Sequence, residues 1–460
     1  MTDVVSSGRE DALLARVREV LPAVRADLED LVRIPSVWAD PARRDEVVRS
    51  AEAVSKLLSE AGFDDVRIVS EGGAPAVIAS HPAPPGAPTV LLYAHHDVQP
   101  EGDAGQWASP PFEPTERDGR LYGRGTADDK AGIATHLAAF RAHDGRPPVG
   151  VTVFVEGEEE SGSPSLGALL AAHRDALAAD VIVIADSDNW STEIPALTVS
   201  LRGLADCVVE VETLDHGLHS GLWGGVVPDA LGALIRLLAT LHDDEGNVAV
   251  AGLHVGSAAE VDYPPERVRA ESGLLDGVSE VGSGSVVQRL WAKPAITVIG
   301  VDTTTVARSS NTLIPRARAK VSMRVAPGGD AREHLAALTR HLETHAPWGA
   351  KVTVTPGDVG QPYAIDAAGP VYDAARAAFR TAWGRDPIDM GMGGSIPFIA
   401  EFARTFPDAR ILVTGVEDPG TQAHSIDESL HLGVLAKAAT AEALLLEELG
   451  RAGDLGGAAG

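Results

Sequence analysis

The sequence predicts an α/β fold, in which a mostly parallel sheet is sandwiched by helices and a smaller α+β domain is inserted into it. Over the first 200 residues, short continuous apolar runs alternate with helical patterns, which is typical of parallel strands covered on both faces. From about residue 200 the runs alternate apolar and polar residues instead. After about residue 365 the first rhythm returns, so we expect the end of the chain to rejoin the first domain.

The first part of the chain contains two helical patterns before the strands begin. Residues 10–33 form an amphipathic pattern that ends at Ile34-Pro35, because proline disfavours the α conformation in the residue before it. Val47–Ala61 is predicted as a second helix, closed by Gly62. The predicted strands are Val66–Val69, Ala76–Ser80, Thr89–Ala94, Val149–Val155 and Val181–Ala185, with helices at Lys130–His143 and Ser165–Ala178 between the last three.

The middle of the chain, residues 201–364, is predicted to be the inserted α+β domain, because its strands and helices lack the regular βα order. Leu204–Glu212 alternates like a strand with one exposed face, and Pro228–His242 is predicted as a helix with proline in its first turn. The Gly/Ser-rich residues 243–290 give no clear assignment. The other predicted elements are the strands Ile296–Val301, Ala317–Val325 and Lys351–Thr355 and the helix Ala331–His345.

The last part of the chain returns to the α/β pattern. Its predicted elements are the helix Gly369–Trp383, the strand Arg410–Thr414 and the helix Leu430–Leu449. We therefore expect residues 1–200 and 365–450 to form one domain, and residues 451–460 to be a disordered tail.

Composition and charge limit the classes of protein. With 44% hydrophobic and 23% charged residues over 460 positions, the composition is that of a globular protein. The formal net charge of −28 argues against nucleic-acid binding, which requires a basic face. No apolar run approaches the roughly 18 residues of a membrane-spanning helix, and the first residues lack the pattern of a secretion signal. Cys207 is the single cysteine, which excludes an intrachain disulfide, so we expect a cytoplasmic protein.

Acidic and histidine side chains gather where the predicted strands end. The clusters are His95-His96-Asp97, Asp128-Asp129, Glu158-Glu159-Glu160 and Asp186-Ser187-Asp188. The carboxyl ends of parallel strands meet at one edge of a sheet, where ligands bind. Carboxylates that are gathered there are costly to desolvate unless a cation lies between them. The sequence therefore predicts a pair of divalent metal ions at this edge, and with it a metal-dependent hydrolase.

Most of these clusters have a simpler explanation when each is taken alone. His95 and Asp97 could be polar residues that cap a strand, and Asp128 or Asp129 could be the N-cap of the helix that begins at Lys130. A lone histidine such as His424 is more often a surface or core residue than a ligand. Three consecutive acids at the end of a buried strand are harder to explain, because they repel one another without a cation.

Together, these motifs resemble the dinuclear metallopeptidase family that includes carnosinases and other dipeptidases, aminoacylases, succinyl-diaminopimelate desuccinylases and the folate-cleaving carboxypeptidase. The resemblance extends from Ile34-Pro35-Ser36-Val37 to Ala423-His424-Ser425. It implies two divalent metal ions per chain. Zinc suits the nitrogen and oxygen ligands, as do manganese and cobalt. The metal ligands that the resemblance implies are His95, Asp128, Glu160, Asp188 and His424, with Asp128 shared by both ions.

The resemblance also implies roles for residues around the metals. Glu159 would be the general base, and Asp97 would orient His95. Asp188 is preferred to Asp186 as a ligand, because the family's ligand precedes an asparagine in the dipeptidase branch. The side chains that would act on the substrate are His219, which would stabilise the oxyanion from the partner subunit, and Asn311, Arg324, Gly394 and Ser395, which would hold the substrate's carboxylate.

A homodimer follows from the same resemblance, with the inserted domain acting as lid and dimerisation surface. We expect it to form through the exposed edge of the strand Leu204–Glu212 and the helix Pro228–His242. No membrane or nucleic-acid partner is expected.

The motifs Asp97-Val98-Gln99-Pro100 and Gly157–Ser163 look most like the dipeptidase branch. They imply hydrolysis of the amide bond of dipeptides or short peptides that carry a free C-terminal carboxylate. The alternative is an amidohydrolase that removes an acyl or succinyl group from an amino acid at the same site. A non-catalytic binding protein of the same fold is a more remote alternative, because all five ligands and Glu159 are present.

Overall fold

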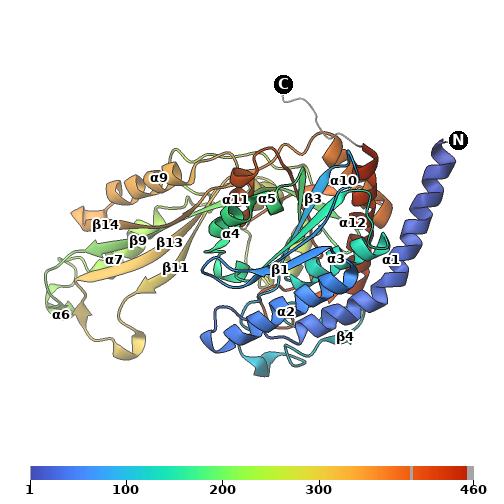
Figure 1. Cartoon of the computed structure of the whole chain (residues 1–460). Coiled ribbons are helices and arrows are strands. Elements are labelled where there is room, and N and C mark those ends of the chain that lie inside the picture. The colour runs from blue at the N-terminus through green and yellow to red at the C-terminus, as the bar shows by residue number, and fades with distance from the viewer. Residues whose placement is uncertain (1, 394–396, 453–460) are drawn as a thin grey trace. The chain divides into compact units, whose positions relative to one another are not determined.

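The structure, a computed structural model, describes residues 2–393 and 397–452 (Figure 1). The chain divides into two compact units. The main unit contains Met1–Val199, Ile365–Met390 and Phe398–Gly460, and the inserted unit contains Ser200–Ala364 and Gly391–Pro397. Gly391, Met392 and Gly393, which the sequence placed in the first domain, group with the inserted unit.

The main unit is built on a six-stranded sheet in the order β1-β2-β6-β3-β7-β17. Its strands are β1 (Asp65–Val69), β2 (Ala76–His81), β3 (Thr89–His95), β6 (Gly150–Glu156), β7 (Val181–Ile184) and β17 (Arg410–Val413). β6, β3, β7 and β17 run parallel to one another, whereas β1, β2 and β6 pair antiparallel. The predicted mostly parallel sheet is therefore confirmed, with antiparallel strands at one edge.

Helices cover both faces of this sheet, because its strands are apolar on both sides. Val90, Leu92 and Ala94 of β3 belong to a large apolar core that they form with the longer helices. Tyr93 stacks instead on Phe398 of α11 (Pro397–Thr405), with ring centroids 4.6 Å apart. The helices that contribute to the core are α1 (Thr2–Val32), α2 (Arg44–Ala61), α3 (Lys130–Ala142), α10 (Pro370–Trp383) and α12 (Leu432–Ala452).

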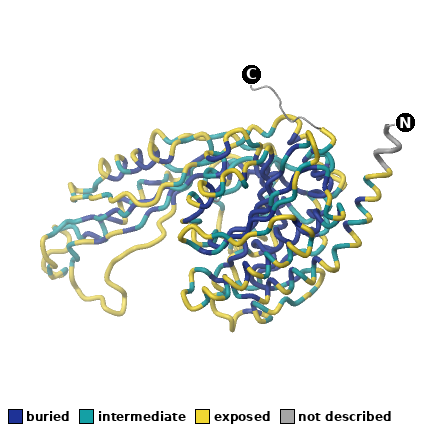
Figure 2. Tube along the Cα trace, viewed as in Figure 1, coloured by how far each residue is buried: buried dark blue, intermediate teal, exposed yellow. Residues whose placement is uncertain are grey.

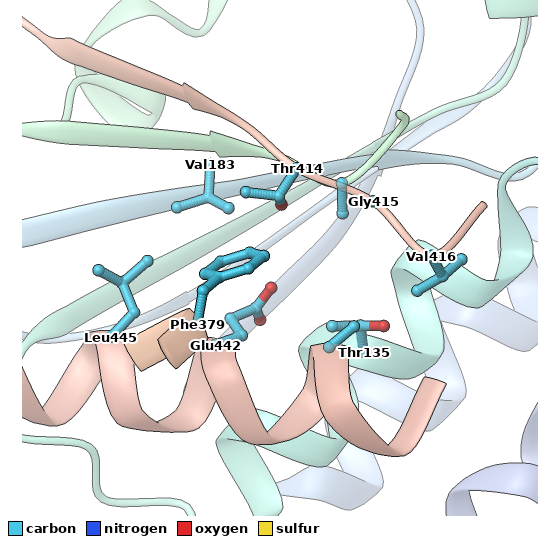
Figure 3. A pocket seen from close by; sticks show the side chains of 10 residues that line it. Thr135, Val183, Phe379, Thr414, Gly415, Val416, Glu442 and Leu445 are labelled. Atoms are coloured by element: carbon cyan, nitrogen blue, oxygen red, sulfur yellow. The ribbon is translucent and has the colours of Figure 1, made fainter. Parts of the chain in front are cut away.

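A small cavity shows how the helices meet the sheet (Figure 3). Val183 of β7, Phe379 of α10 and Glu442 of α12 line it, and none of the predicted metal ligands does. The carboxylate of Glu442 lies 2.9 Å from Nδ1 of the buried His136, whose Nε2 is 3.0 Å from the carbonyl oxygen of Tyr93. Burial alone would lower the pKa of His136, but the charge of Glu442 and the hydrogen bonds raise it. The His136 ring therefore links α3 and α12 to β3, the strand that ends at His95.

A smaller sheet in the main unit joins two segments that are distant in sequence. Its order is β18-β5-β4, with strands β4 (Thr115–Arg117), β5 (Arg120–Tyr122) and β18 (Ser429–His431). β5 and β18 pair antiparallel, so the residues after β5 and the residues before β18 lie side by side.

The inserted unit contains a four-stranded antiparallel sheet in the order β11-β13-β9-β14. Its strands are β9 (Gly203–Glu212), β11 (Ala295–Asp302), β13 (Arg316–Val325) and β14 (Lys351–Gly360). Helices α7 (Ala230–Ala239) and α9 (Ala331–Thr344) pack on the sheet. Burial alternates along β9, where the single cysteine, Cys207, is among the inward residues of a second apolar core (Figure 2).

The remaining elements are short. They are α4 (Leu166–Ala172), α5 (Arg174–Leu177), β8 (Ala196–Leu201), β10 (Leu218–His219), α6 (Ser220–Trp223), α8 (Pro265–Ser272), β12 (Thr312–Leu313), β15 (Tyr363–Ala364) and β16 (Ile388–Met392). None of the described helices is long and apolar enough to cross a membrane.

Several expectations are corrected by the structure. β9 lies between β13 and β14, so the alternating strand Leu204–Glu212 is not an edge and cannot pair with its copy in a partner. Helix α7 begins at Ala230 rather than Pro228, because the carboxylate of Asp229 accepts a hydrogen bond from the Gly232 amide at 2.8 Å and caps the helix. Helix α12 continues to Ala452, into the segment predicted as a tail, and residues 453–460 lie outside the described residues.

The cap of α7 gives a stability prediction for the inserted unit. Asp229→Ala removes the acceptor of the Gly232 amide, so the free energy of unfolding should fall by about 0.5–2 kcal/mol in chemical denaturation. Asp244→Ala, at an exposed loop position nearby, is the matched control and should leave stability unchanged. Equal stabilities for the two variants would show that the cap does not stabilise the helix.

Candidate metal centre

The predicted ligands of the main unit lie where its central strands end. His95 is the last residue of β3, and Glu159 and Glu160 form a one-turn 3-10 helix after β6. Asp186 follows β7 by two residues, and His424 lies in the loop between β17 and β18. Asp128 precedes α3, whose N-cap is Asp129. Because β6, β3 and β7 are neighbours in the sheet, these side chains reach one edge together.

Two groups of these side chains are close enough to hold a metal ion. One consists of His95, Asp128 and Glu160, and the other of His95, Glu159 and Asp186. Within each group the potential ligand atoms all lie within 4.8 Å of one another.

Asp128 lies between two imidazole rings. Its Oδ1 is 3.1 Å from Nε2 of His95, and its Oδ2 is 3.0 Å from Nε2 of His424. Nε2 of His424 is also 3.1 Å from Oε2 of Glu160. Each oxygen of one carboxylate therefore faces a different histidine, which is the arrangement that a ligand shared by two cations requires.

The backbone and the neighbouring side chains hold these groups in place. Nδ1 of His95 donates to the carbonyl oxygen of Asp97 at 3.0 Å, which leaves the Nε2 lone pair for a cation. The carboxylate of Asp97 accepts hydrogen bonds from the amides of Glu159 and Glu160, at 3.1 and 3.2 Å. Asp97 was expected to orient His95. Both its carbonyl oxygen, at 3.0 Å, and its carboxylate, at 3.5 Å, lie near Nδ1 of His95.

The cluster has an excess of negative charge that the pKa values reveal. Burial, and then the charges of Asp128 and Glu160, raise the pKa of Asp186 to about 7 against the opposing charge of His95. Burial and nearby acids also raise the pKa of Glu159 well above its usual range. Hydrogen bonds to Asp128 and Glu160 raise the pKa of His424 to about 10. The carboxylates thus draw positive charge toward themselves, as expected of a cation-binding site.

One predicted ligand is replaced by a neighbour. Oδ2 of Asp186 lies 3.9 Å from Nε2 of His95, and Asp186, not Asp188, belongs to the candidate metal groups among the described residues. The backbone of Asp188 forms a parallel β-bridge with Glu417. The preference for the acid before asparagine was therefore misleading, because Asp186 is the acid that follows the end of β7 directly and reaches the sheet edge.

Glu417 is an acid of this region that the sequence analysis missed. Its carbonyl accepts hydrogen bonds from the backbone and side-chain amides of Asn189, at 2.8 and 3.1 Å. Burial, followed by the charges of Asp188, Asp128 and Asp186, raises the pKa of Glu417 well above its usual range. Its position shortly after β17, a parallel strand of the same sheet, was the signal that could have identified it.

The other predicted site residues belong to the inserted unit. His219 is exposed at the end of β10, and the carbonyl of Asn311 accepts a hydrogen bond from the Ser220 amide at 2.9 Å, so His219 and Asn311 lie close together. Arg324 is half-buried on β13, where its charge acts on the buried Arg202. Gly394 and Ser395 lie outside the described residues.

Curated relatives and solved structures resemble the chain over most of its length. It is 36% identical to a cysteinylglycine-S-conjugate dipeptidase of Corynebacterium striatum, over 92% of this chain and 95% of that protein. It is 30% identical to a human beta-Ala-His dipeptidase, over 78% of this chain and 74% of that protein. The crystal structure of human carnosine dipeptidase 1 superposes with a TM-score of 0.79 at 25% identity, covering 96% of this chain and 99% of that one.

A family model extends these pairwise similarities. It matches residues 91–448, which include His95, Asp128, Glu160, Asp186 and His424. Together with the dipeptidase at 36% identity, this match shows that the chain belongs to Peptidase family M20/M25/M40.

Proposed function

We propose that the chain is a metal-dependent dipeptidase that hydrolyses the amide bond of dipeptides or short peptides with a free C-terminal carboxylate. The observation that carries the proposal is the position of Asp128, whose two oxygens face His95 and His424 at 3.1 and 3.0 Å. Family membership and the dipeptidase names of the relatives support peptide substrates over N-acyl amino acids.

The residues of the cluster fit two divalent cations. His95, Asp128 and Asp186 would hold one ion, and Asp128, Glu160 and His424 the other. The raised pKa values of Asp186 and Glu160 support this assignment, because buried carboxylates are stabilised in their charged form by nearby positive charge. Imidazole and carboxylate ligands suit zinc, which we propose, and also manganese or cobalt. When bound, such ions polarise the scissile carbonyl and acidify a water molecule.

Glu159 is the residue that we propose as general base. Its carboxylate lies 4.0 Å from Nε2 of His95, at the edge of the cluster, and its side chain keeps 18% of its surface exposed. It can therefore meet both solvent and substrate. Glu159 would take a proton from the attacking water and deliver it to the leaving amine nitrogen as the C–N bond breaks.

Arg324 is the residue that we propose to bind the substrate's carboxylate. Burial and the nearby charge of Arg324 lower the pKa of Arg202 to about 10, so two guanidinium groups lie near each other. Among the residues that the structure describes, neither has a carboxylate within ion-pair distance. Arg202 is occupied by backbone carbonyls, including that of Gly393 at 3.2 Å. A substrate carboxylate would supply the missing negative charge, for which a guanidinium offers two parallel donors.

His219 is proposed to stabilise the oxyanion across a homodimer. Its Nδ1 accepts a hydrogen bond from the Gly221 amide at 3.1 Å, so the neutral ring carries its proton on Nε2, which is then available as a donor. Exposed apolar side chains on the edge strand β11, namely Val298, Ile299 and Val301, support association through the inserted unit. A single-chain mass in light scattering would contradict the dimer.

We also propose a cytoplasmic location, supported by the one buried cysteine.

A substrate panel tests the proposed function. Purified protein supplied with zinc should hydrolyse dipeptides, with N-acyl amino acids as poorer substrates, in an assay that follows release of the free amino acid. Exhaustive chelation should abolish hydrolysis, and added zinc, manganese or cobalt should restore it. Preferred cleavage of N-acyl amino acids would favour the amidohydrolase instead, and full activity in verified absence of metal would exclude the metal-dependent reaction.

Substitutions in the turn Glu159–Ser161 should distinguish the general base from the metal ligand. Glu159→Gln keeps the shape but removes the proton acceptor, so kcat should fall by about 10²–10⁴ while metal content stays unchanged. Glu160→Gln, one residue away in the same turn, should lower metal content as measured by elemental analysis. Equal loss of metal in both variants would contradict the roles given to the two residues.

The carboxylate site is tested by pairing a variant with a modified substrate. Arg324→Ala should lower kcat/KM for a free-acid dipeptide by roughly thirtyfold or more, because truncating one partner of a desolvated charge pair costs about 2–5 kcal/mol. The same variant should change kcat/KM for the amidated dipeptide far less. Arg318→Ala on the same strand, with 56% of its side chain exposed, is the control and should behave like the unsubstituted protein with both substrates. An equal loss on both substrates would make Arg324 a structural residue.

A further inference from the structure

Two buried side chains connect the loops that carry Asp128 and His424. Arg124 and Glu428 are 1% and 0% exposed, and Nη1 of Arg124 lies 2.7 Å from Oε2 of Glu428. Neither residue is a candidate ligand, and neither was singled out in the sequence. The pair lies beside the β5–β18 ladder, which aligns the same two segments.

The carboxylate of Glu428 holds the backbone of the Asp128 loop. It accepts hydrogen bonds from the amides of Gly125 at 3.0 Å, Ala127 at 3.1 Å and Asp128 at 3.2 Å. The carbonyl of Glu428 accepts a further bond from the Gly123 amide at 3.0 Å. Three of these bonds converge on one side chain, so the position of Asp128 depends directly on Glu428.

Arg124 acts in the opposite direction, on the His424 loop. Its Nη2 donates to the carbonyl of Ser425 at 3.0 Å, next to His424, and lies 3.4 Å from the carbonyl of Pro100. This loop contains three non-glycine residues with positive φ, Gln422 at 56°, His424 at 62° and Asp427 at 56°. Such conformations are unfavourable and persist where surrounding contacts hold them. The bond from Arg124 is one of these contacts.

A general contribution to stability explains this arrangement poorly. A buried ion pair is often no more stabilising than apolar side chains of the same size, because both charges lose their hydration. The particular feature here is that each member binds the backbone of the loop opposite its own. Arg124 comes from the Asp128 loop and binds at Ser425, and Glu428 comes from the His424 loop and binds at Asp128.

We propose that Arg124 and Glu428 are positioning residues that set the separation between Asp128 and His424. They thereby set the affinity of the second metal position, the one that Asp128, Glu160 and His424 would form. This role rests on the proposed metal-dependent function. The pair acts through the backbone and touches neither substrate nor metal. Replacing the carboxylate by an amide would break the ion pair with Arg124 and remove the charge that strengthens the bonds from the Gly125, Ala127 and Asp128 amides. The Asp128 and His424 loops would then be less firmly joined, and the 3.0 Å separation of Asp128 and His424 would be lost.

The test compares the buried Arg124–Glu428 pair with the partly buried Arg120–Asp418 pair, which links the same segments. The experimental variant is Glu428→Gln, and the matched control is Asp418→Asn. Asp418 is 3% exposed and pairs with Arg120 of β5 at 3.0 Å, but it contacts none of the amides from Gly125 to Asp128. Zinc affinity is measured by competition with a chromophoric chelator, and stability without metal by chemical denaturation.

Glu428→Gln should weaken the second of two zinc ions by roughly tenfold to a hundredfold, the usual effect of losing a group that orients metal ligands, and should weaken the first ion, which shares Asp128, by less. Asp418→Asn should lower stability and leave both affinities unchanged. If Glu428→Gln does not fold, Arg124→Lys decides. It replaces the two nitrogens that bind Glu428 and the Ser425 carbonyl, Nη1 and Nη2, by one ammonium without their fixed geometry, and should weaken the same ion.

Two results would overturn the proposal. One is unchanged affinity for both ions in Glu428→Gln, or in Arg124→Lys if Glu428→Gln does not fold. The other is an equal loss of affinity in Asp418→Asn. Failure of the proposed function itself would look different, because the unsubstituted protein would then bind fewer than two zinc ions.

Discussion

Concentration of carboxylates at the end of one sheet is the constraint on which the rest of the site depends. Asp128, Glu159, Glu160 and Asp186 lie close enough that burial and mutual repulsion raise the pKa values of the last three. Their opposing charges come from His95 and His424, between which Asp128 is placed. Such a cluster is costly in a protein interior unless cations share it. The fold gathers these side chains because strands β6, β3 and β7 are neighbours and end at the same edge of the sheet.

The precision of the site comes from residues that do not face a cation. The carboxylate of Asp97 fixes the Glu159–Glu160 turn, Asp129 caps α3 and accepts a hydrogen bond from the His95 amide, and His136 links α3 to β3. The backbone around the ligands is thereby held by hydrogen bonds to the side chains of Asp97, Asp129 and His136. Arg124 and Glu428 extend the same principle to the loop that carries His424.

Local patterns in the sequence predicted much of this structure. Continuous apolar runs that end in acidic or histidine residues located β3, β6 and β7 and the side chains at their ends, because both signals lie within a few residues of each other. Longer-range features could not be read in this way. Alternation along β9 shows that one face is buried, but it does not show whether strands flank it on both sides. The choice between Asp186 and Asp188 depends on where β7 ends, and the Arg124–Glu428 pair joins residues 304 positions apart.

The most direct test of the shared role of Asp128 is an anomalous difference map from a crystal grown with zinc. The account predicts two peaks per chain, about 3.5–4 Å apart, with the carboxylate of Asp128 between them. One peak should contact His95 and Asp186, and the other Glu160 and His424. A single peak, or two peaks of which only one contacts Asp128, would contradict the account.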